Sequence, residues 1–257
     1  MKVTIITVAF NSAKTIEDTI KSVLSQDYPN LEYIIVDGGS SDSTLEIIRS
    51  YQDKIAVLIS EPDRGMYDAM NKGIAKATGE VIGILNSDDT YMSNTTISEL
   101  MALMQQRAVD IVYADLIIVD PMDRHKVLRY YDSSYFQPTK FKSGWMPAHP
   151  TVFVKRHLYE DFGYFKLDYQ IAADYEMLIR LLYVHQASYA YLPKPAVRMR
   201  FGGASTANLA RNWILNQEII RACRANGIAT SWWMLLGKVP FKVWSSVKGK
   251  ARLRAIK

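Results

Sequence analysis

The first 119 residues alternate between short apolar runs and amphipathic stretches, and this alternation constrains the fold more than any other feature of the chain. The apolar runs are rich in Val, Ile and Thr, which is typical of strands buried on both faces. They span Val3–Val8, Leu31–Val36, Ala56–Ile59, Val81–Leu85 and Ile111–Val119. After the first run, Ile16, Ile20 and Val23 recur at helical spacing, and Asn11-Ser12 is suited to cap that helix. Strands that alternate with helices predict an α/β fold, with a mostly parallel sheet and helices on both faces.

The remaining elements are less regularly spaced. The other helices predicted between these strands are Leu45–Tyr51, Met66–Ala77 and Thr95–Gln106. In the second half we expect an excursion over the sheet, a return strand, a helix and two short strands, at Tyr130–Lys142, Pro147–Val154, Ile171–Val184, Ser188–Leu192 and Ala196–Phe201. A flexible Gly202–Ser205 loop then leads to a long amphipathic helix, Ala207–Asn226. We expect one folded body, residues 1–226, and a helical tail, residues 227–257.

The composition excludes several classes of protein. With 257 residues, 49% of them apolar and 22% charged, the chain is neither collagen-like, disordered nor a coiled coil. Its single cysteine, Cys223, excludes a disulfide framework and a cysteine-rich zinc site. No uncharged stretch approaches the ~20 residues that a membrane-spanning helix needs. We therefore expect a soluble protein on the cytoplasmic side of the membrane.

The charge is unevenly distributed along the chain. After Glu218 there is no acidic residue but there are nine Lys and Arg, so a net charge of +5 leaves residues 1–218 at −4. Trp232, Trp233 and Trp244 lie among these cations. Cations interleaved with Trp and Leu predict a segment that lies in the headgroup layer of an anionic membrane. The alternative is a solvated tail whose aromatic residues pack on the body. We expect no nucleic acid partner, because no groove-reading motif accompanies the basic segment.

Polar residues follow each of the first four predicted strands. The strands end at Ala9-Phe10-Asn11, Asp37-Gly38-Gly39, Glu61–Gly65 and Asn86–Asp89. Ligands of open parallel sheets bind beyond the carboxyl ends of the strands, so these residues are expected at one edge. Carboxylates gathered there require a counter-charge, and a divalent cation with a polyphosphate supplies one. Taken singly, Asp37 and Asp88-Asp89 also suit solvated turns, and Phe10 also suits the core.

Together, these motifs resemble those of a known protein family. Four motifs, in this order and spacing, resemble those of the family-two glycosyltransferases with the GT-A (Rossmann-like) fold: Thr7–Asn11, Val36–Thr44, Glu61–Gly73 and Leu85–Asp89. A fifth motif, Ala172–Glu176, is similar to the acidic motif that carries the family's base. The family usually has Glu-Asp where this chain has Ala173-Asp174. The resemblance covers about residues 1–205.

The resemblance implies a role for each matching residue. The nucleotide sugar would be bound by Ala9, Phe10, Asn11, Asp37, Asp63, Arg64, Asn71 and Asp88. Among these, Phe10 would stack on the nucleobase, Asp37 would accept a hydrogen bond from it, and Arg64 would approach the diphosphate. Asp89 would coordinate Mn²⁺ or Mg²⁺, and Asp174 would be the general base.

Further residues are candidates for the acceptor site or a lid. His149 resembles a histidine of members that extend bacterial surface polysaccharides, and it also suits a structural role between two prolines. Arg198, Arg200 and the Gly202–Ser205 loop, which includes Ser205, could form a lid that closes over the diphosphate and excludes water; the alternative is an ordinary surface loop.

The resemblance thus predicts an inverting glycosyltransferase. Residues 1–120 would bind the donor, a UDP-hexose or UDP-N-acetylhexosamine, and residues 121–226 the acceptor, a saccharide that is lipid-linked at the inner face of a bacterial membrane. A bound cation stabilises the departing diphosphate, and a carboxylate takes the proton of the acceptor hydroxyl. Two alternatives stay open: an inactive nucleotide-sugar-binding subunit, and a sugar nucleotidyltransferase. The latter needs a Gly-rich phosphate loop that Ala9–Ser12 does not provide.

Overall fold

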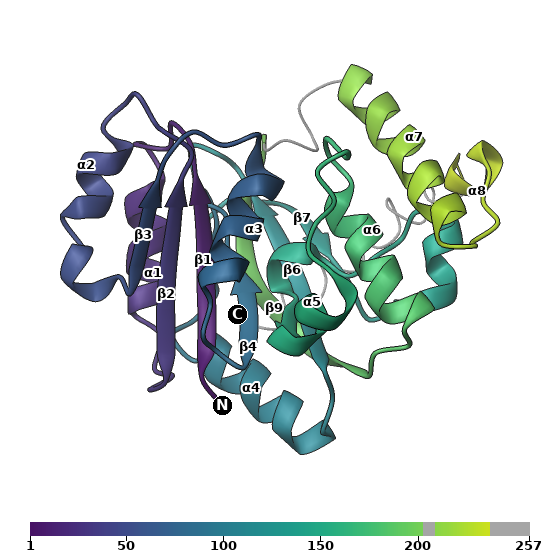
Figure 1. Ribbon diagram of the computed structural model, residues 1–257, viewed down its shortest axis with the longest axis horizontal. Helices are drawn as coiled ribbons and strands as arrows, with labels where there is room; N and C mark the ends of the chain where they lie inside the picture. The colour runs from purple at the N-terminus through teal and green to yellow at the C-terminus, as the bar shows by residue number, and fades with distance from the viewer. Residues whose placement is uncertain (203–208, 237–257) are drawn as a thin grey trace.

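The computed structural model describes residues 1–202 and 209–236 of the protein. Within these ranges, nine strands form one sheet in the order β3-β2-β1-β4-β8-β6-β9-β5, and β7 pairs with β6 outside this path (Figure 1). The strands are β1 (Val3–Ala9), β2 (Leu31–Asp37), β3 (Val57–Ser60), β4 (Val81–Ile84), β5 (Thr90–Tyr91), β6 (Ile111–Val119), β7 (Val127–Tyr131), β8 (Phe153–Lys155) and β9 (Tyr189–Arg200).

Most of the paired residues lie in parallel strands. β1, β2, β3 and β4 run parallel, and so do β6 and β9, whereas β8 is antiparallel to both β4 and β6. The register of β1 with β2 runs from Val3 opposite Leu31 to Ala9 opposite Asp37, so both strands end level. We call the edge where β1 to β4 end the carboxyl edge. The prediction of a mostly parallel sheet is confirmed.

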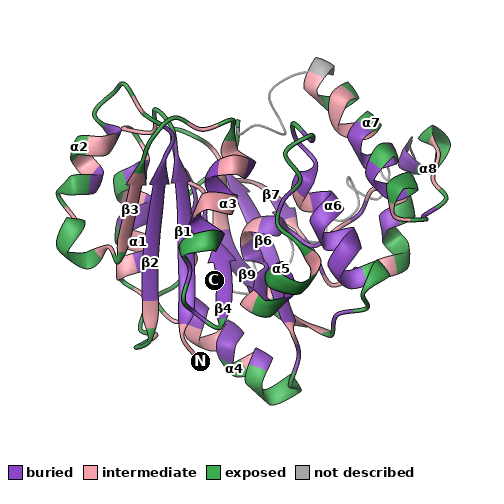
Figure 2. Cartoon of the chain, viewed as in Figure 1, coloured by how far each residue is buried: buried purple, intermediate pink, exposed green. Residues whose placement is uncertain are grey.

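Helices cover both faces of the sheet, as predicted. They are α1 (Ile16–Leu24), α2 (Thr44–Arg49), α3 (Met66–Lys76), α4 (Thr96–Arg107), α5 (Arg156–Phe162), α6 (Ala173–Ile179), α7 (Leu209–Ala225) and α8 (Trp232–Leu236). Alternate strand residues face opposite layers. Ile6 of β1 belongs to the core shared with Met70 of α3, and Ile5 to the core shared with Ile20 of α1. In Figure 1, α3, α5 and α6 lie in front of the sheet and α1 lies behind it. The central strands are accordingly buried along most of their length (Figure 2).

The start of α1 differs from the prediction. Asn11-Ser12 does not cap this helix: Thr15 is its N-cap, and the Ser12 carbonyl accepts the Ile16 N–H at 2.9 Å. Asn11 instead has φ +48°, and its side-chain oxygen accepts the N–H of Ser41 at 2.9 Å. The amide that was expected at the helix therefore joins the loop after β1 to the loop after β2.

Three segments of the second half differ from their predicted structure. The predicted excursion begins earlier as a strand, β7, because the chain turns back after β6, where the Asp120 N–H donates to the Lys126 carbonyl at 3.0 Å. The predicted return strand is a 3₁₀ turn, His149–Thr151, followed by β8, because Pro150 has no N–H for a ladder. The two predicted strands around Pro193 are one strand, β9, whose second edge pairs only at Val197 and Arg198 among the described residues. Proline is tolerated on such an edge.

The helix that carries Asp174 is shorter than predicted. It begins at Ala173, and from Arg180 to Val184 the backbone forms a π-helical turn. π-helical turns are rare and are frequently found at functional sites. Asp174 lies in the first turn of α6, as predicted.

The described part of the tail packs on the body. Ile228 and Leu235 are buried in the same core as α6, and the Trp232 ring stacks on Trp213 of α7 with centroids 4.6 Å apart. This arrangement agrees with the alternative in which aromatic residues return to the body. Ser205 and residues 237–257 lie outside the described residues. Among the helices that are described, none is long and apolar enough to cross a membrane.

Candidate active site

The loops after β1 and β2 are joined at the carboxyl edge. Asp37, at the end of β2, is fully buried, and its carboxylate accepts the Ser40 N–H at 3.2 Å and the Ser60 hydroxyl at 2.8 Å. The Ser40 hydroxyl in turn accepts the N–H of Asn11 at 2.8 Å. The Gly38 N–H donates to the Ala9 carbonyl at 2.9 Å. Asp37 therefore fixes the backbone around it. Ala9 joins the two loops through its carbonyl, and Asn11 through its N–H and its side-chain amide.

An exposed aromatic ring lies beside an acidic side chain at this edge. Phe10 is 62% exposed although it directly follows a fully buried strand. A Cβ at position 38 would lie 2.3 Å from Asp63 Oδ2 and 3.4 Å from Phe10 Cδ2, so Gly38 allows both side chains to approach. Asp63 Oδ1 accepts the N–H of Gly65 at 2.8 Å. A flat ring with an adjacent carboxylate is suited to stack and hydrogen-bond a nucleobase.

The Asp88-Asp89 pair lies in the turn after β4. The hydroxyls of Ser12 and Ser87 lie 2.8 Å apart, which joins this turn to the loop after β1. Asp89 is fully buried; its Oδ1 accepts the Arg200 N–H at 3.3 Å, and its Oδ2 has no hydrogen-bond partner among the described residues. Asp88 is half-buried. Burial raises the pKa of both carboxyls, and the charge of Asp88 raises the pKa of Asp89 further.

These residues fit a cation that is completed by a substrate. In residues 1–202 and 209–236, no group of three His, Cys, Asp or Glu side chains could hold a metal ion alone. Mg²⁺ is usually bound through one or two carboxylates plus substrate phosphates, without a cage made by the protein. A buried carboxylate oxygen that lacks a donor is the kind of group that a cation satisfies. Of the pair, only Asp88 is partly accessible.

The arginines near this turn have different environments. Arg200 Nη2 forms a 2.7 Å ion pair with Asp18, and its Nε donates to the Asp88 carbonyl at 3.2 Å. Arg198 pairs with Thr90 in the sheet, and its Nε is buried with no partner in the part of the chain that is described. Arg64 is 77% exposed and lies 3.2 Å from Asp68. Of the two arginines of β9, Arg200 therefore contacts Asp88, whereas the side chain of Arg64 extends into solvent.

Asp174 is tied to the carboxyl edge by a tyrosine. Tyr67, in the first turn of α3, donates to the Ile171 carbonyl at 2.5 Å and to Asp174 Oδ1 at 3.3 Å. The same oxygen accepts the N–H of Tyr175 at 2.8 Å. Because α3 follows the loop after β3, this contact places Asp174 near the end of that strand. Burial raises the pKa of Asp174, although His149 and the hydrogen bonds oppose this. A carboxyl with a raised pKa is suited to accept a proton.

His149 and Asn71 support the surroundings of Asp174. His149 is 8% exposed, and its ring meets Phe165 edge-on at 5.7 Å between centroids. Burial lowers its pKa, and the Asp174 charge acts in the opposite direction. Asn71 Nδ2 donates to the Phe165 carbonyl at 2.8 Å, and its Oδ1 accepts the Phe165 N–H at 3.0 Å. The side-chain amide of Asn71 thus forms both of its described hydrogen bonds with the backbone of Phe165.

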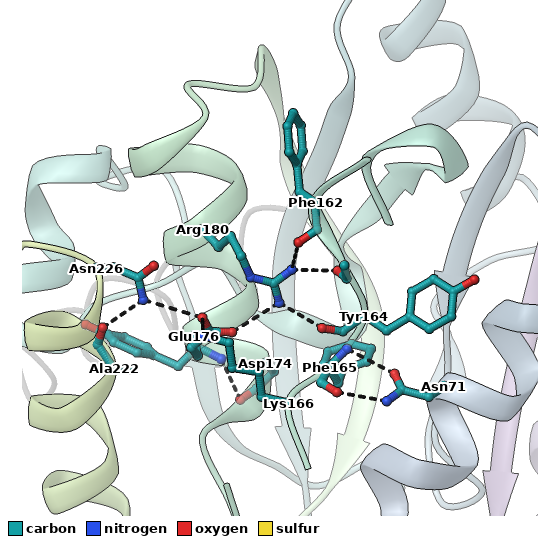
Figure 3. A network of polar contacts seen from close by, with 12 residues as sticks. Asn71, Phe162, Tyr164, Phe165, Lys166, Asp174, Glu176, Arg180, Ala222 and Asn226 are labelled. Carbon is teal, nitrogen blue, oxygen red and sulfur yellow. Dashed lines mark hydrogen bonds and ion pairs between the residues drawn. The ribbon is translucent and has the colours of Figure 1, made fainter. Parts of the chain in front are cut away.

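The second carboxylate of the Ala172–Glu176 motif is neutralised by cations (Figure 3). Glu176 is fully buried and lies 2.7 Å from Lys166 and 3.1 Å from Arg180. Arg180 also donates to the carbonyls of Phe162, Gly163 and Tyr164. Glu176 therefore belongs to a structural network, and Asp174 is the carboxylate of this motif that is free of cations among the described ion pairs.

Two residues of the site were missed in the sequence. Tyr67 lies inside a quoted motif, but only the fold shows that its hydroxyl meets Asp174. Glu218 of α7 accepts the backbone N–H groups of Gln170, Ile171 and Ala172 at 2.7, 2.9 and 2.9 Å. Its only signal in the sequence is that it is the last acidic residue before the basic segment.

Sequence comparisons find glycosyltransferases. The family model described as glycosyl transferase family 2 matches residues 4–162. An uncharacterized glycosyltransferase of Mycobacterium tuberculosis is 34% identical over 182 residues, which cover 69% of this chain and 68% of that protein. A PGL/p-HBAD biosynthesis glycosyltransferase of Mycobacterium bovis is 27% identical over 229 residues, which cover 84% of this chain and 82% of that protein.

Solved structures with the same fold include two nucleotide-sugar complexes. S. aureus TarS 1-349 in complex with UDP-GlcNAc has a TM-score of 0.65 at 20% identity, over 89% of this chain and 68% of that one. The mannosyltransferase PcManGT from Pyrobaculum calidifontis, in complex with GDP-Man and Mn²⁺, has a TM-score of 0.61 at 21% identity, over 95% of this chain and 83% of that one. These likenesses confirm the expected GT-A fold. With the family match over more than half of its length, the chain belongs to glycosyl transferase family 2.

Proposed function

We propose that this protein transfers a sugar from a nucleoside-diphosphate sugar to a saccharide hydroxyl, with inversion at the anomeric carbon. The observation that carries the proposal is the contact between Tyr67 and Asp174, at 3.3 Å. It brings a carboxyl with a raised pKa to the edge where Phe10, Asp37 and Asp88 are found. A donor site and a base are then on the same side of the sheet.

In the proposed donor site, Phe10 stacks on the nucleobase. Asp37 keeps the loop of Gly38 in place through Ser40 and Ser60, so Asp63, which is half-buried beside Phe10, is the carboxylate accessible to the base or ribose. The relatives in complex with UDP-GlcNAc and with GDP-Man support a diphosphate nucleotide in general. Among these donors we propose a UDP-hexose or UDP-N-acetylhexosamine.

For the metal, we propose Mn²⁺ or Mg²⁺ held by the Asp88-Asp89 pair and the donor diphosphate. Asp88 is the accessible member of the pair, whereas Asp89 is enclosed and holds the Arg200 backbone. Asp89 keeps its predicted ligand role through Oδ2, which has no partner among the described residues, and Asp88 is proposed as a second ligand. When bound, the ion stabilises the negative charge that develops on the departing diphosphate. Arg198 Nε is buried and has no partner among the described residues, and we propose that this side chain faces the same negative charge.

Asp174 is proposed to take the proton of the acceptor hydroxyl. As this oxygen forms its bond to the anomeric carbon, the bond from that carbon to the diphosphate oxygen breaks, and the proton ends on Asp174. Attack from the face opposite the leaving group inverts the configuration. Tyr67 orients the carboxylate by donating to Oδ1.

The acceptor is proposed to be lipid-linked and reached at an anionic membrane surface. Trp213, Trp233 and Met234 are 57%, 83% and 45% exposed, and Arg224 lies on the same helix as Trp213. Exposed Trp with neighbouring cations suits a headgroup layer. The mycobacterial relative named for PGL/p-HBAD biosynthesis supports a glycoconjugate acceptor. Sedimentation with phosphatidylglycerol vesicles, and its loss when Trp213 and Trp233 are both changed to Ala, tests this part; equal sedimentation of both proteins contradicts it.

The donor and the base are tested together. A panel of nucleotide sugars is screened by thermal shift with and without Mn²⁺, because a ligand of the folded state raises the melting temperature. Asp174→Asn is expected to keep the stabilisation by UDP and Mn²⁺ and to lower turnover about a thousandfold, since general-base catalysis contributes 10²–10⁴-fold. Unchanged turnover would refute the assignment of Asp174. Stabilisation without any turnover by the unmodified protein would favour the inactive binding subunit.

A further inference from the structure

Glu218 of α7 holds the backbone that leads into α6. It is 8% exposed, and one of its carboxylate oxygens accepts two of the three N–H groups of residues 170–172. α6 has no side-chain cap of its own within the described residues, and Ala172 is its N-cap. Glu218 therefore accepts the N–H of the N-cap residue and of the two residues before it, and places a negative charge at the N-terminus of α6.

The same backbone is held from the opposite side by the tyrosine that contacts Asp174. The Ile171 N–H donates to Glu218 at 2.9 Å, and the Ile171 carbonyl accepts the Tyr67 hydroxyl at 2.5 Å. That hydroxyl also lies 3.3 Å from Asp174 Oδ1. Ile171 is thereby fixed between α7 and α3, three residues before Asp174. A shift of this peptide would move the tyrosine and the carboxylate relative to each other.

A second residue of α7 holds the preceding part of the loop. Arg221 Nη2 donates to the Asp168 carbonyl at 2.6 Å, and its guanidinium carbon lies 3.8 Å from the centre of the Tyr169 ring. Arg221 contacts residues 168 and 169 and has no described contact with Ile171 or Ala172. It therefore offers a matched control, because its loss loosens the same loop on the same helix farther from Asp174.

We propose that Glu218 is a positioning residue for glycosyl transfer, which keeps Asp174 aligned with the acceptor through the peptides of residues 170–172. This inference rests on the proposed role of Asp174. Glu218 contacts neither donor nor acceptor in the proposal, so its loss is expected to affect turnover and leave nucleotide binding intact. Small misplacements of a catalytic group cost up to about a hundredfold in rate.

The test compares Glu218→Gln, Glu218→Asp and Arg221→Gln in the full chain. Hydrogen exchange is expected to accelerate about tenfold or more at the amides of residues 170–172 in Glu218→Gln, since hydrogen bonds to charged groups are the stronger ones. UDP release from UDP-GlcNAc and UDP-glucose with Mn²⁺ is expected to fall tenfold to a hundredfold, with the affinity for UDP changed less than twofold. Arg221→Gln is expected to alter turnover less than threefold. Glu218→Asp, which keeps the charge, is expected to recover part of the rate and replaces the Gln variant if that one does not fold.

The Asp174→Asn background separates positioning from a merely structural role. If Glu218 acts through Asp174, Glu218→Gln lowers turnover in the unmodified protein and has little further effect when Asp174 is already Asn. An equal loss in both backgrounds, a loss that matches the unfolded fraction, or unchanged exchange at residues 170–172 would overturn the proposal. If Asp174→Asn itself keeps full turnover, the proposed base is wrong, whereas the exchange experiment still reports whether Glu218 holds the loop.

Discussion

Glu32 offers a prediction whose size follows from the structure. This carboxylate lies on β2, 7% exposed, and accepts hydrogen bonds from Lys2 Nζ at 2.7 Å, Thr4 Oγ1 at 2.6 Å and the Thr78 N–H at 2.8 Å. Burial alone would raise its pKa, but the hydrogen bonds from Lys2, Thr4 and Thr78 outweigh it and lower the pKa from 4.5 to about 2. Since one pKa unit corresponds to about 1.4 kcal/mol, the charged form stabilises the folded protein by about 3 kcal/mol.

The lowered pKa of Glu32 determines how its contribution to the free energy of unfolding changes with pH. The stabilisation by Glu32 is fully present above pH 4.5, the unfolded value, and is lost as the pH falls toward 2. Glu32→Gln is therefore expected to lower the free energy of unfolding by about 3 kcal/mol at pH 7 and by about 1 kcal/mol at pH 3. Urea unfolding of both proteins from pH 7 to pH 3 measures this. An equal difference at both ends of the range would refute the reasoning.

The remaining predictions concern the donor site. Phe10→Ala is expected to weaken UDP binding with Mn²⁺ about tenfold in calorimetry, because stacking of a base on an aromatic ring contributes ~1–3 kcal/mol, and the melting temperature is expected to stay the same since Phe10 is 62% exposed. Unchanged affinity would contradict the stacking role. Gly38→Ala is expected to weaken UDP binding severalfold, because its Cβ would lie 2.3 Å from Asp63 Oδ2 and displace that side chain from Phe10; wild-type affinity would show that Asp63 is not needed there.

The strands and helices of the first half were predictable because each follows from local pattern. Continuous apolar runs such as Val3–Ala9 are buried on both faces, and α1 presents apolar residues at helical spacing. For β9 the sequence predicts two strands, on either side of residues 193–195, because proline usually interrupts a strand. Proline is tolerated there because this part of β9 pairs with β6 alone among the described residues, and the neighbours of a strand are a property of the sheet and not of the segment.

The candidate site likewise contains some residues that the sequence pattern could place and others that depend on distant contacts. The residues at the ends of β1, β2 and β4 could be placed at one edge because parallel strands end together. The side chain of Asn11 was assigned to a local cap, but its partner is Ser41, 30 residues away. Glu218 meets backbone groups 46 to 48 residues earlier in the chain, and no spacing rule connects positions so far apart.

The proposed donor site and the proposed base are held by different parts of the structure. The donor side depends on loops that are joined to each other at the carboxyl edge, through contacts such as Ser12 with Ser87. The proposed base, Asp174, depends on α3 and α7, which both hold the peptide of Ile171. Changes in α7 can therefore alter the alignment of Asp174 while the donor loops keep their structure.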